Sequence, residues 1–264
     1  MYDTLTGYLD HWAQECADDI WLREHHGETL EEWTWKEAQE QVYALAAWQE
    51  ENLSGPGSKI GLLSRNCPHW FLADLGSIAA GNVTVPMFTT LPAETADYVM
   101  TFTDMELLFV GQTENWEQLS AVLPEGIKLV TLPGADIEQE HLRWEDIISP
   151  NLGRRPAHKS QHDDLISIVF TSGTTGLPKG VMQTHDSNVI PINRFREAFR
   201  LPDRARFFSY LPLSHIAERQ IVEYASLINA GEVFFNENML TMLRDLPECR
   251  PHMMFGPPRV WEQL

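Results

Sequence analysis

Short apolar runs alternate with helix-like segments along most of this 264-residue chain. The clearest run is Leu165–Thr171 (LISIVFT), which carries no charge and does not alternate between polar and apolar residues. Strands of that kind are buried on both faces, as in a parallel sheet covered by helices. The repeated strand–helix units therefore predict an α/β fold, with mostly parallel sheets flanked by helices in layers.

The other elements follow from the same signals: apolar residues at helical spacing predict helices, and short apolar runs between Gly or Pro predict strands. The predicted strands are Lys59–Ser64, Val83–Phe88, Glu106–Val110, Ile127–Leu132, Leu165–Thr171, Arg206–Tyr210, Glu232–Phe235 and His252–Phe255. The predicted helices are Thr6–Cys16, Lys36–Asn52, Pro68–Ala80, Glu94–Thr103, Ser187–Arg200, Ile216–Asn229 and Met239–Leu246.

A loop-rich passage divides the chain into two α/β parts. It extends from Ser149 to Asp164 and contains Pro150, Gly153 and Pro156. We interpret it as a connection between two layers of the structure. The two parts are then residues 1–155 and residues 156–264.

Charge excludes several classes of partner. The chain has 38 Asp and Glu against 19 Lys and Arg, for a formal charge of −19. Such a surface repels phosphate backbones, which argues against nucleic acid as a partner. No apolar run approaches the roughly 18 residues of a transmembrane segment. The N-terminus has no signal-peptide pattern, and three widely separated cysteines are typical of reduced thiols, so we expect a cytoplasmic protein.

The segment after the apolar strand Leu165–Thr171 is built to hold a polyphosphate. Glycines allow backbone N–H groups to converge on one anion, and hydroxyl side chains add donors. A lysine, one of only five in the chain, supplies a mobile positive charge. The spacing is not that of a Walker A loop, since Leu-Pro separates the last loop glycine from the lysine. The candidate phosphate-binding residues are Thr171, Ser172, Gly173, Thr174, Thr175, Gly176, Lys179 and Gly180.

Three motifs in order resemble those of one enzyme family. IVFTSGTTGLPKGVMQTH is similar to the phosphate loop of the adenylate-forming (AMP-binding) superfamily, which includes acyl-CoA synthetases. YLPLSHIAER, which begins at Tyr210, resembles the next core motif in the form found in long-chain fatty acid–CoA ligases. GPPRVWE, which begins at Gly256, resembles a segment of the same branch. The resemblance covers the whole chain.

The resemblance implies a two-step reaction. A fatty acid carboxylate attacks the α-phosphorus of ATP and expels pyrophosphate, and coenzyme A then displaces AMP to give the thioester. The loop and Lys179 would hold the β- and γ-phosphates, and Thr171 would be a ligand of Mg²⁺. His215 would lie beside the nucleotide and the acyl carboxylate as a catalytic residue. Glu218, a cofactor-binding candidate, and Arg219 would flank that pocket.

Several family motifs do not occur in these 264 residues. They include the Gly-Tyr-Gly-x-Thr-Glu sequence, the ribose-binding Asp and the C-terminal domain with its lysine. The sequence therefore suggests an incomplete N-terminal domain, inactive by itself, from a protein whose full length could make peripheral contact with a membrane. Two alternatives stay open: another acyl- or aryl-adenylating enzyme, and a non-catalytic phosphate- or acyl-binding protein derived from this fold.

Overall fold

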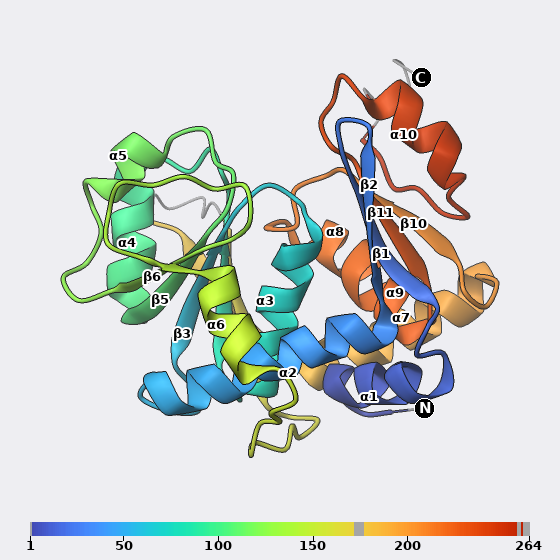
Figure 1. The fold of residues 1–264 in the computed structure, drawn as a ribbon, viewed down its shortest axis with the longest axis horizontal. Coiled ribbons are helices and arrows are strands. Elements are labelled where there is room, and N and C mark those ends of the chain that lie inside the picture. The colour runs from blue at the N-terminus through green and yellow to red at the C-terminus, as the bar shows by residue number, and fades with distance from the viewer. Residues whose placement is uncertain (1, 172–176, 258–259, 261–264) are drawn as a thin grey trace.

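Two sheets lie side by side, with helices between and around them (Figure 1). The computed structural model describes residues 2–171, 177–257 and 260. One sheet has seven strands and the other has four. Because six of the seven strands run in the same direction, and the four-stranded sheet is antiparallel only at β2, the α/β fold with mostly parallel sheets is confirmed.

The seven-stranded sheet contains most of the predicted strands and adds two. Its last strand, β9, runs antiparallel to β8, so the phosphate loop connects two strands of a hairpin. In spatial order the strands are β7 (Leu142–Arg143), β6 (Lys128–Thr131), β5 (Met105–Val110), β3 (Lys59–Leu63), β4 (Val83–Met87), β8 (Leu165–Thr171) and β9 (Lys179–Thr184).

The four-stranded sheet combines two strands from the N-terminal part of the chain with two strands from after residue 200. Its first two strands form a hairpin that turns at Gly27, whose φ of +64° favours glycine. In spatial order the strands are β10 (Arg206–Ser209), β11 (Glu232–Phe235), β1 (Ile20–His26) and β2 (Thr29–Thr34). Both sheets therefore combine strands from before and after residue 155, and the division into residues 1–155 and 156–264 stays a prediction about the sequence.

Helix α3 is the centre of the main core. Eleven of its 12 residues are buried, as expected of a helix that contacts protein on every side. The core around it takes side chains from both sheets, while a second core lies under α4 and α5 on the other face of the larger sheet. The α-helices are α1 (Leu5–Glu15), α2 (Trp35–Asn52), α3 (Pro68–Ala79), α4 (Ala93–Thr103), α5 (Trp116–Ser120), α6 (Trp144–Asn151), α7 (His185–Phe199), α8 (Ile216–Glu218), α9 (Ala225–Ile228) and α10 (Met242–Cys249), and η1 (Arg219–Tyr224) is a π-helix.

Two predicted elements near the C-terminus are corrected. The helix expected over Met239–Leu246 is α10, which starts later because Asn238 and Thr241 form a side-chain-capped turn ahead of it. The strand expected over His252–Phe255 is a single bridge between Phe207 and Met253. The His252 ring accepts the Arg206 N–H at 2.9 Å, which uses a donor that a longer ladder would need.

No helix in the described part of the chain is both long and apolar enough to cross a bilayer.

Candidate functional site

A cleft of about 300 Å³ opens where strands of both sheets end. Its walls come from the segments that follow β3, β4, β5, β10 and β11, and they include Asn66, Thr89, Tyr210, Ser214 and Asn236. Crevices outside the carboxyl ends of parallel strands are the usual ligand sites of α/β proteins. This position makes the cleft the first candidate for a binding site.

A second, more apolar cavity of about 350 Å³ lies on the other side of the end of β4. Met87, Phe88 and Val99 form its apolar wall. Thr171 and Pro178 also line it, and they belong to the phosphate hairpin, which is β8, β9 and the loop between them. Since Phe88 lines this cavity and Thr89 lines the 300 Å³ cleft, the two spaces are neighbours along one stretch of chain.

Three of the predicted phosphate-binding residues, Thr171, Lys179 and Gly180, lie on the β8–β9 hairpin. Thr171 ends β8 and pairs with Lys179, the first residue of β9, with the Thr171 hydroxyl 3.5 Å from the Lys179 carbonyl. Lys179 and Gly180 are exposed. The remaining members of the loop, residues 172–176, lie outside the described residues.

His215 stands at the start of α8, on the side of the four-stranded sheet. Its side chain is exposed, and its Nδ1 accepts the Ala217 N–H at 3.1 Å, so it caps the helix. Its neighbour Ser214 lines the 300 Å³ cleft. Thr171 lines the apolar cavity instead, so the phosphate hairpin and the His215 segment border two adjacent spaces.

Glu218 is buried and forms hydrogen bonds with the segment that leads to His215. It is 1% exposed, and its carboxylate accepts the Tyr210 N–H at 3.1 Å. Burial raises the pKa of Glu218 to about 8, although the hydrogen bonds from Tyr210, Leu211 and Ser209 act in the opposite direction. The contacts of Glu218 are therefore with the backbone that carries the motif Tyr210–Arg219.

Arg219 does not flank a pocket, which corrects the expectation from the motif. It is 0% exposed and forms an ion pair with Asp74 of α3. A guanidinium is rarely buried completely unless it is paired, and Asp74 supplies that pair from another part of the chain.

Asn66 is a site residue that sequence reasoning missed. Its Nδ2 donates to Ser209 Oγ at 2.9 Å and to the Leu211 carbonyl at 2.6 Å, and its Oδ1 accepts the Leu213 N–H at 3.0 Å. It thereby ties the end of β3 to the segment that carries His215. The available signal was its place directly after a buried strand, where polar residues of α/β folds tend to serve a ligand site.

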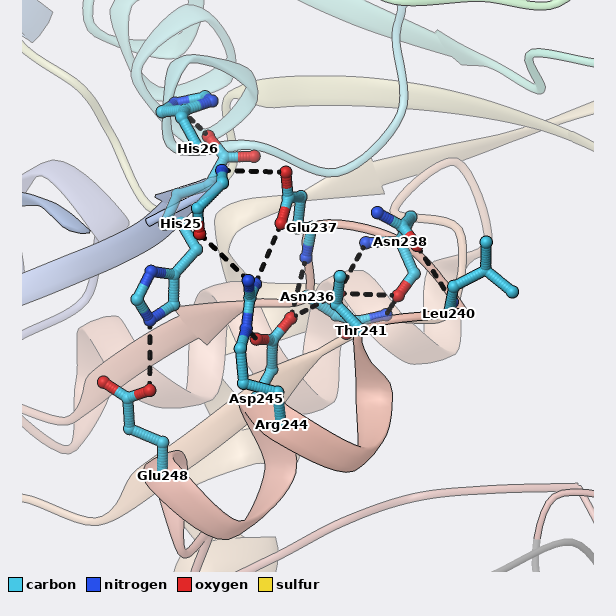
Figure 2. A network of polar contacts seen from close by, with 12 residues as sticks. His25, His26, Asn236, Glu237, Asn238, Leu240, Thr241, Arg244, Asp245 and Glu248 are labelled. Atoms are coloured by element: carbon cyan, nitrogen blue, oxygen red, sulfur yellow. Dashed lines mark hydrogen bonds and ion pairs between the residues drawn. The ribbon is translucent and has the colours of Figure 1, made fainter. Parts of the chain in front are cut away.

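A polar network fixes the far wall of the cleft (Figure 2). Arg244 contacts Glu237 at 2.8 Å, Asp245 at 2.6 Å and the Gly27 carbonyl at 2.9 Å. Glu237 in turn accepts the Gly27 N–H at 3.0 Å. These contacts hold the segment after β11 against the turn of the β1–β2 hairpin. The wall that includes Asn236 and Glu237 is therefore preorganised.

Metal-binding capacity is small in the described residues. They contain no cluster of three His, Cys, Asp or Glu side chains suited to a metal ion. At the phosphate hairpin, the exposed Thr171 hydroxyl offers a neutral oxygen. That donor suits Mg²⁺ only in a site completed by phosphate oxygens and other ligands, which is how Mg²⁺ commonly binds nucleotides.

The buried carboxyl groups predict a stability that falls as pH rises. Burial raises the pKa of Glu218 to about 8 and that of Glu24 to about 7, from 4.5. A carboxyl group that holds its proton more tightly in the folded state costs stability as pH rises from the unfolded pKa to the folded one. We expect the free energy of unfolding to fall between pH 5 and 8, by up to about 1.4 kcal/mol per pH unit for each group.

Urea denaturation at pH 5 and pH 8 measures this effect. Glu218→Gln should lose less stability than the wild type over that range, whereas the exposed Glu94→Gln should match the wild type. An identical pH dependence in Glu218→Gln and the wild type would contradict the assignment.

Comparisons with known proteins give the family of the chain. The family model for AMP-binding enzymes matches residues 9–264. The chain is 30% identical to the long-chain-fatty-acid–CoA ligase heimdall of Drosophila melanogaster over 229 residues, which cover 78% of this chain and 33% of that protein. It is also 30% identical to the human long-chain-fatty-acid–CoA ligase ACSBG2 over 223 residues, which cover 78% of this chain and 33% of that protein. The chain thus spans about a third of the length of these curated relatives.

Solved structures share the fold at low sequence identity. The anthranilate CoA ligase AuaEII, in complex with anthranoyl-AMP, superposes with a TM-score of 0.84 at 19% identity, over 94% of this chain and 48% of that one. The N-terminal domain of FACL13 from Mycobacterium tuberculosis gives 0.81 at 18% identity, over 94% of this chain and 61% of that one. The chain therefore belongs to the AMP-binding enzyme family and has the fold of the N-terminal domain of adenylate-forming enzymes.

Proposed function

We propose that this chain is the phosphate-binding part of a long-chain fatty acid–CoA ligase. The observation that carries the proposal is the Thr171–Gly180 sequence, which follows a buried parallel strand and begins at the carboxyl edge of the sheet. In the proposed reaction a fatty carboxylate and ATP give an acyl-adenylate and pyrophosphate, and coenzyme A then takes the acyl group and releases AMP.

The loop would bind and stabilise the negative charge of the ATP phosphates. Lys179, Gly173, Gly176, Gly180 and the hydroxyl residues of the loop would hold the β- and γ-phosphates and stabilise the charge on departing pyrophosphate. Lys179 is exposed at the start of β9, so its ammonium group is accessible to a bound phosphate. Mg²⁺, when bound with the nucleotide, would neutralise phosphate charge with Thr171 as one ligand.

The His215 segment would face the nucleotide and the acyl carboxylate from the other sheet. His215 is exposed and beside the cleft, so its ring can contact a ligand there. Glu218 would contribute through the backbone of Tyr210 and Leu211 rather than by direct contact, since its carboxylate is buried under that backbone. The adjacent apolar cavity would suit the acyl part of the substrate.

The partners in this proposal are small molecules: a fatty acid, ATP and coenzyme A. The formal charge of −19 disfavours nucleic acid. We propose a cytoplasmic protein, with any peripheral membrane contact made by the longer protein.

The test is fatty-acid-dependent exchange of labelled pyrophosphate into ATP. A gene product that includes the Gly-Tyr-Gly-x-Thr-Glu motif and a C-terminal domain should exchange pyrophosphate only when a long-chain fatty acid is present. A polypeptide of these 264 residues alone should show no exchange, since it lacks those motifs. Exchange with an aryl acid and not a fatty acid would favour another adenylating enzyme. No exchange by the longer protein would favour a non-catalytic binding protein.

A further inference from the structure

The π-helix η1 meets the larger sheet through one buried guanidinium. Arg219 Nη1 donates to Ser167 Oγ of β8 at 2.6 Å, and its Nη2 donates to Thr84 Oγ1 of β4 at 2.8 Å and to Asp74. All four side chains are at most 1% exposed. The last residue of the His215 motif thus contacts two strands and α3 of the other layer.

Those two contacts lie at the junction of β4 and β8. The two strands share one registered pair, Thr84 with Ser167. The Thr84 hydroxyl donates to the Ile166 carbonyl at 3.1 Å, and the Ser167 hydroxyl donates to the Thr84 carbonyl at 2.9 Å. Each hydroxyl therefore donates to the backbone and accepts from Arg219. The guanidinium therefore adds hydrogen bonds to both strands at the one registered pair that β4 and β8 share.

Two buried carboxyl groups lie beside the Arg219 guanidinium. Asp74 and Glu223 are both 0% exposed beside Arg219, with Glu223 Oε2 3.6 Å from Arg219 Nε. Burial raises the pKa of Glu223 well above its ordinary value, and the Asp74 carboxylate adds to that shift. Asp74 is the carboxylate that accepts a hydrogen bond from the guanidinium, and it also accepts from the Tyr224 hydroxyl at 3.2 Å.

Arg219 also belongs to the His215 segment through its backbone. Its N–H donates to the His215 carbonyl at 3.2 Å, four residues earlier in the chain. On the other side, Ser167 is four residues before Thr171, where the phosphate hairpin begins. One residue thus links the segment that carries His215 to the strand that carries the phosphate loop.

We propose that Arg219 is a positioning residue that sets the place of the phosphate strand β8 relative to the His215 segment. The catalytic part of this proposal, an effect on turnover, rests on the proposed function. Its geometric part, the placement of β8 relative to the His215 segment, does not. Well-packed apolar residues can replace buried ion pairs without loss of stability, so stability alone does not account for this guanidinium. Its planar, forked donors fix direction as well as distance, which is what two facing parts of an active site require.

Amide hydrogen exchange tests the geometric part without any ligand. Arg219→Lys keeps the charge and loses the fork, and Ser167→Ala removes the acceptor on β8 together with the hydroxyl's own bond to the Thr84 carbonyl. Both should accelerate exchange in residues 165–171 and 210–216 by about tenfold or more, the loss expected for one hydrogen bond to a charged group. Arg23→Lys is the matched control, because Arg23 pairs with Glu32 and Glu232 within the smaller sheet.

The pattern of the result decides the proposal. Faster exchange confined to those two segments supports it. Equal acceleration throughout the chain, or none in Ser167→Ala, would overturn it.

Kinetics of the longer protein test the catalytic part. Ser167→Ala and Arg219→Lys should lower kcat for pyrophosphate exchange by about tenfold and leave the KM for the fatty acid unchanged. An active wild type with unaffected variants would contradict the positioning role. A wild type without exchange activity would contradict the proposed function, while the hydrogen exchange result would still decide the geometric part.

Discussion

Replacing Lys179 with Ala in the longer protein is expected to lower fatty-acid-dependent pyrophosphate exchange by about 10²- to 10³-fold, the usual effect of removing one group that stabilises charge in a transition state. Lys179 is exposed at the start of β9, and its backbone pairs with Thr171 across the phosphate hairpin. Its ammonium group can therefore reach phosphate bound at the loop without leaving another partner unsatisfied. The fold should be unaffected, since the side chain is not part of the core.

Two comparisons separate a phosphate-specific role from general damage. Transfer of the acyl group from preformed acyl-adenylate to coenzyme A involves no β- or γ-phosphate, so Lys179→Ala should change it little. Lys159→Ala, at an exposed position in the connection before β8, should leave both steps unchanged. Equal losses in both steps for Lys179→Ala would contradict the phosphate role.

Most of the strands that the sequence predicted are buried ones, although β1, a central strand of the smaller sheet, was missed. β3, β4 and β5 are almost wholly buried, so their apolar composition identifies them directly. β2 and β9 are edge strands with mostly exposed residues, and they were missed. Such strands are defined by pairing with a neighbour, as Lys179 pairs with Thr171, and not by a pattern within their own residues.

The residues around the candidate site show a similar limit of sequence patterns. The phosphate-binding role of the loop stays a prediction, which rests on the chemistry that Gly, Ser, Thr and Lys have in any context. The sequence could not distinguish Glu218 and Arg219 from exposed neighbours of His215, because charged residues are seldom buried. What buries Arg219 is Asp74, which lies 145 residues away along the chain, and no local pattern indicates that contact.

Asp74→Ala is expected to have the largest effect on stability, a loss of about 3–5 kcal/mol in the free energy of unfolding, because it leaves the buried Arg219 charge without its counterion. Denaturant unfolding measures that loss. Asp203→Ala is the matched control, since its ion pair with Arg196 is exposed and should be worth about 0–1 kcal/mol. The double variant Asp74→Ala/Arg219→Met also removes the buried guanidinium, so part of the loss should be recovered. If the single and double variants were equally unstable, the cost would come from the cavity at Asp74 and not from the isolated charge. Recovery of stability without recovery of pyrophosphate exchange would separate the two contributions of the pair: the charge balance concerns the fold, and the forked hydrogen bonds concern the site.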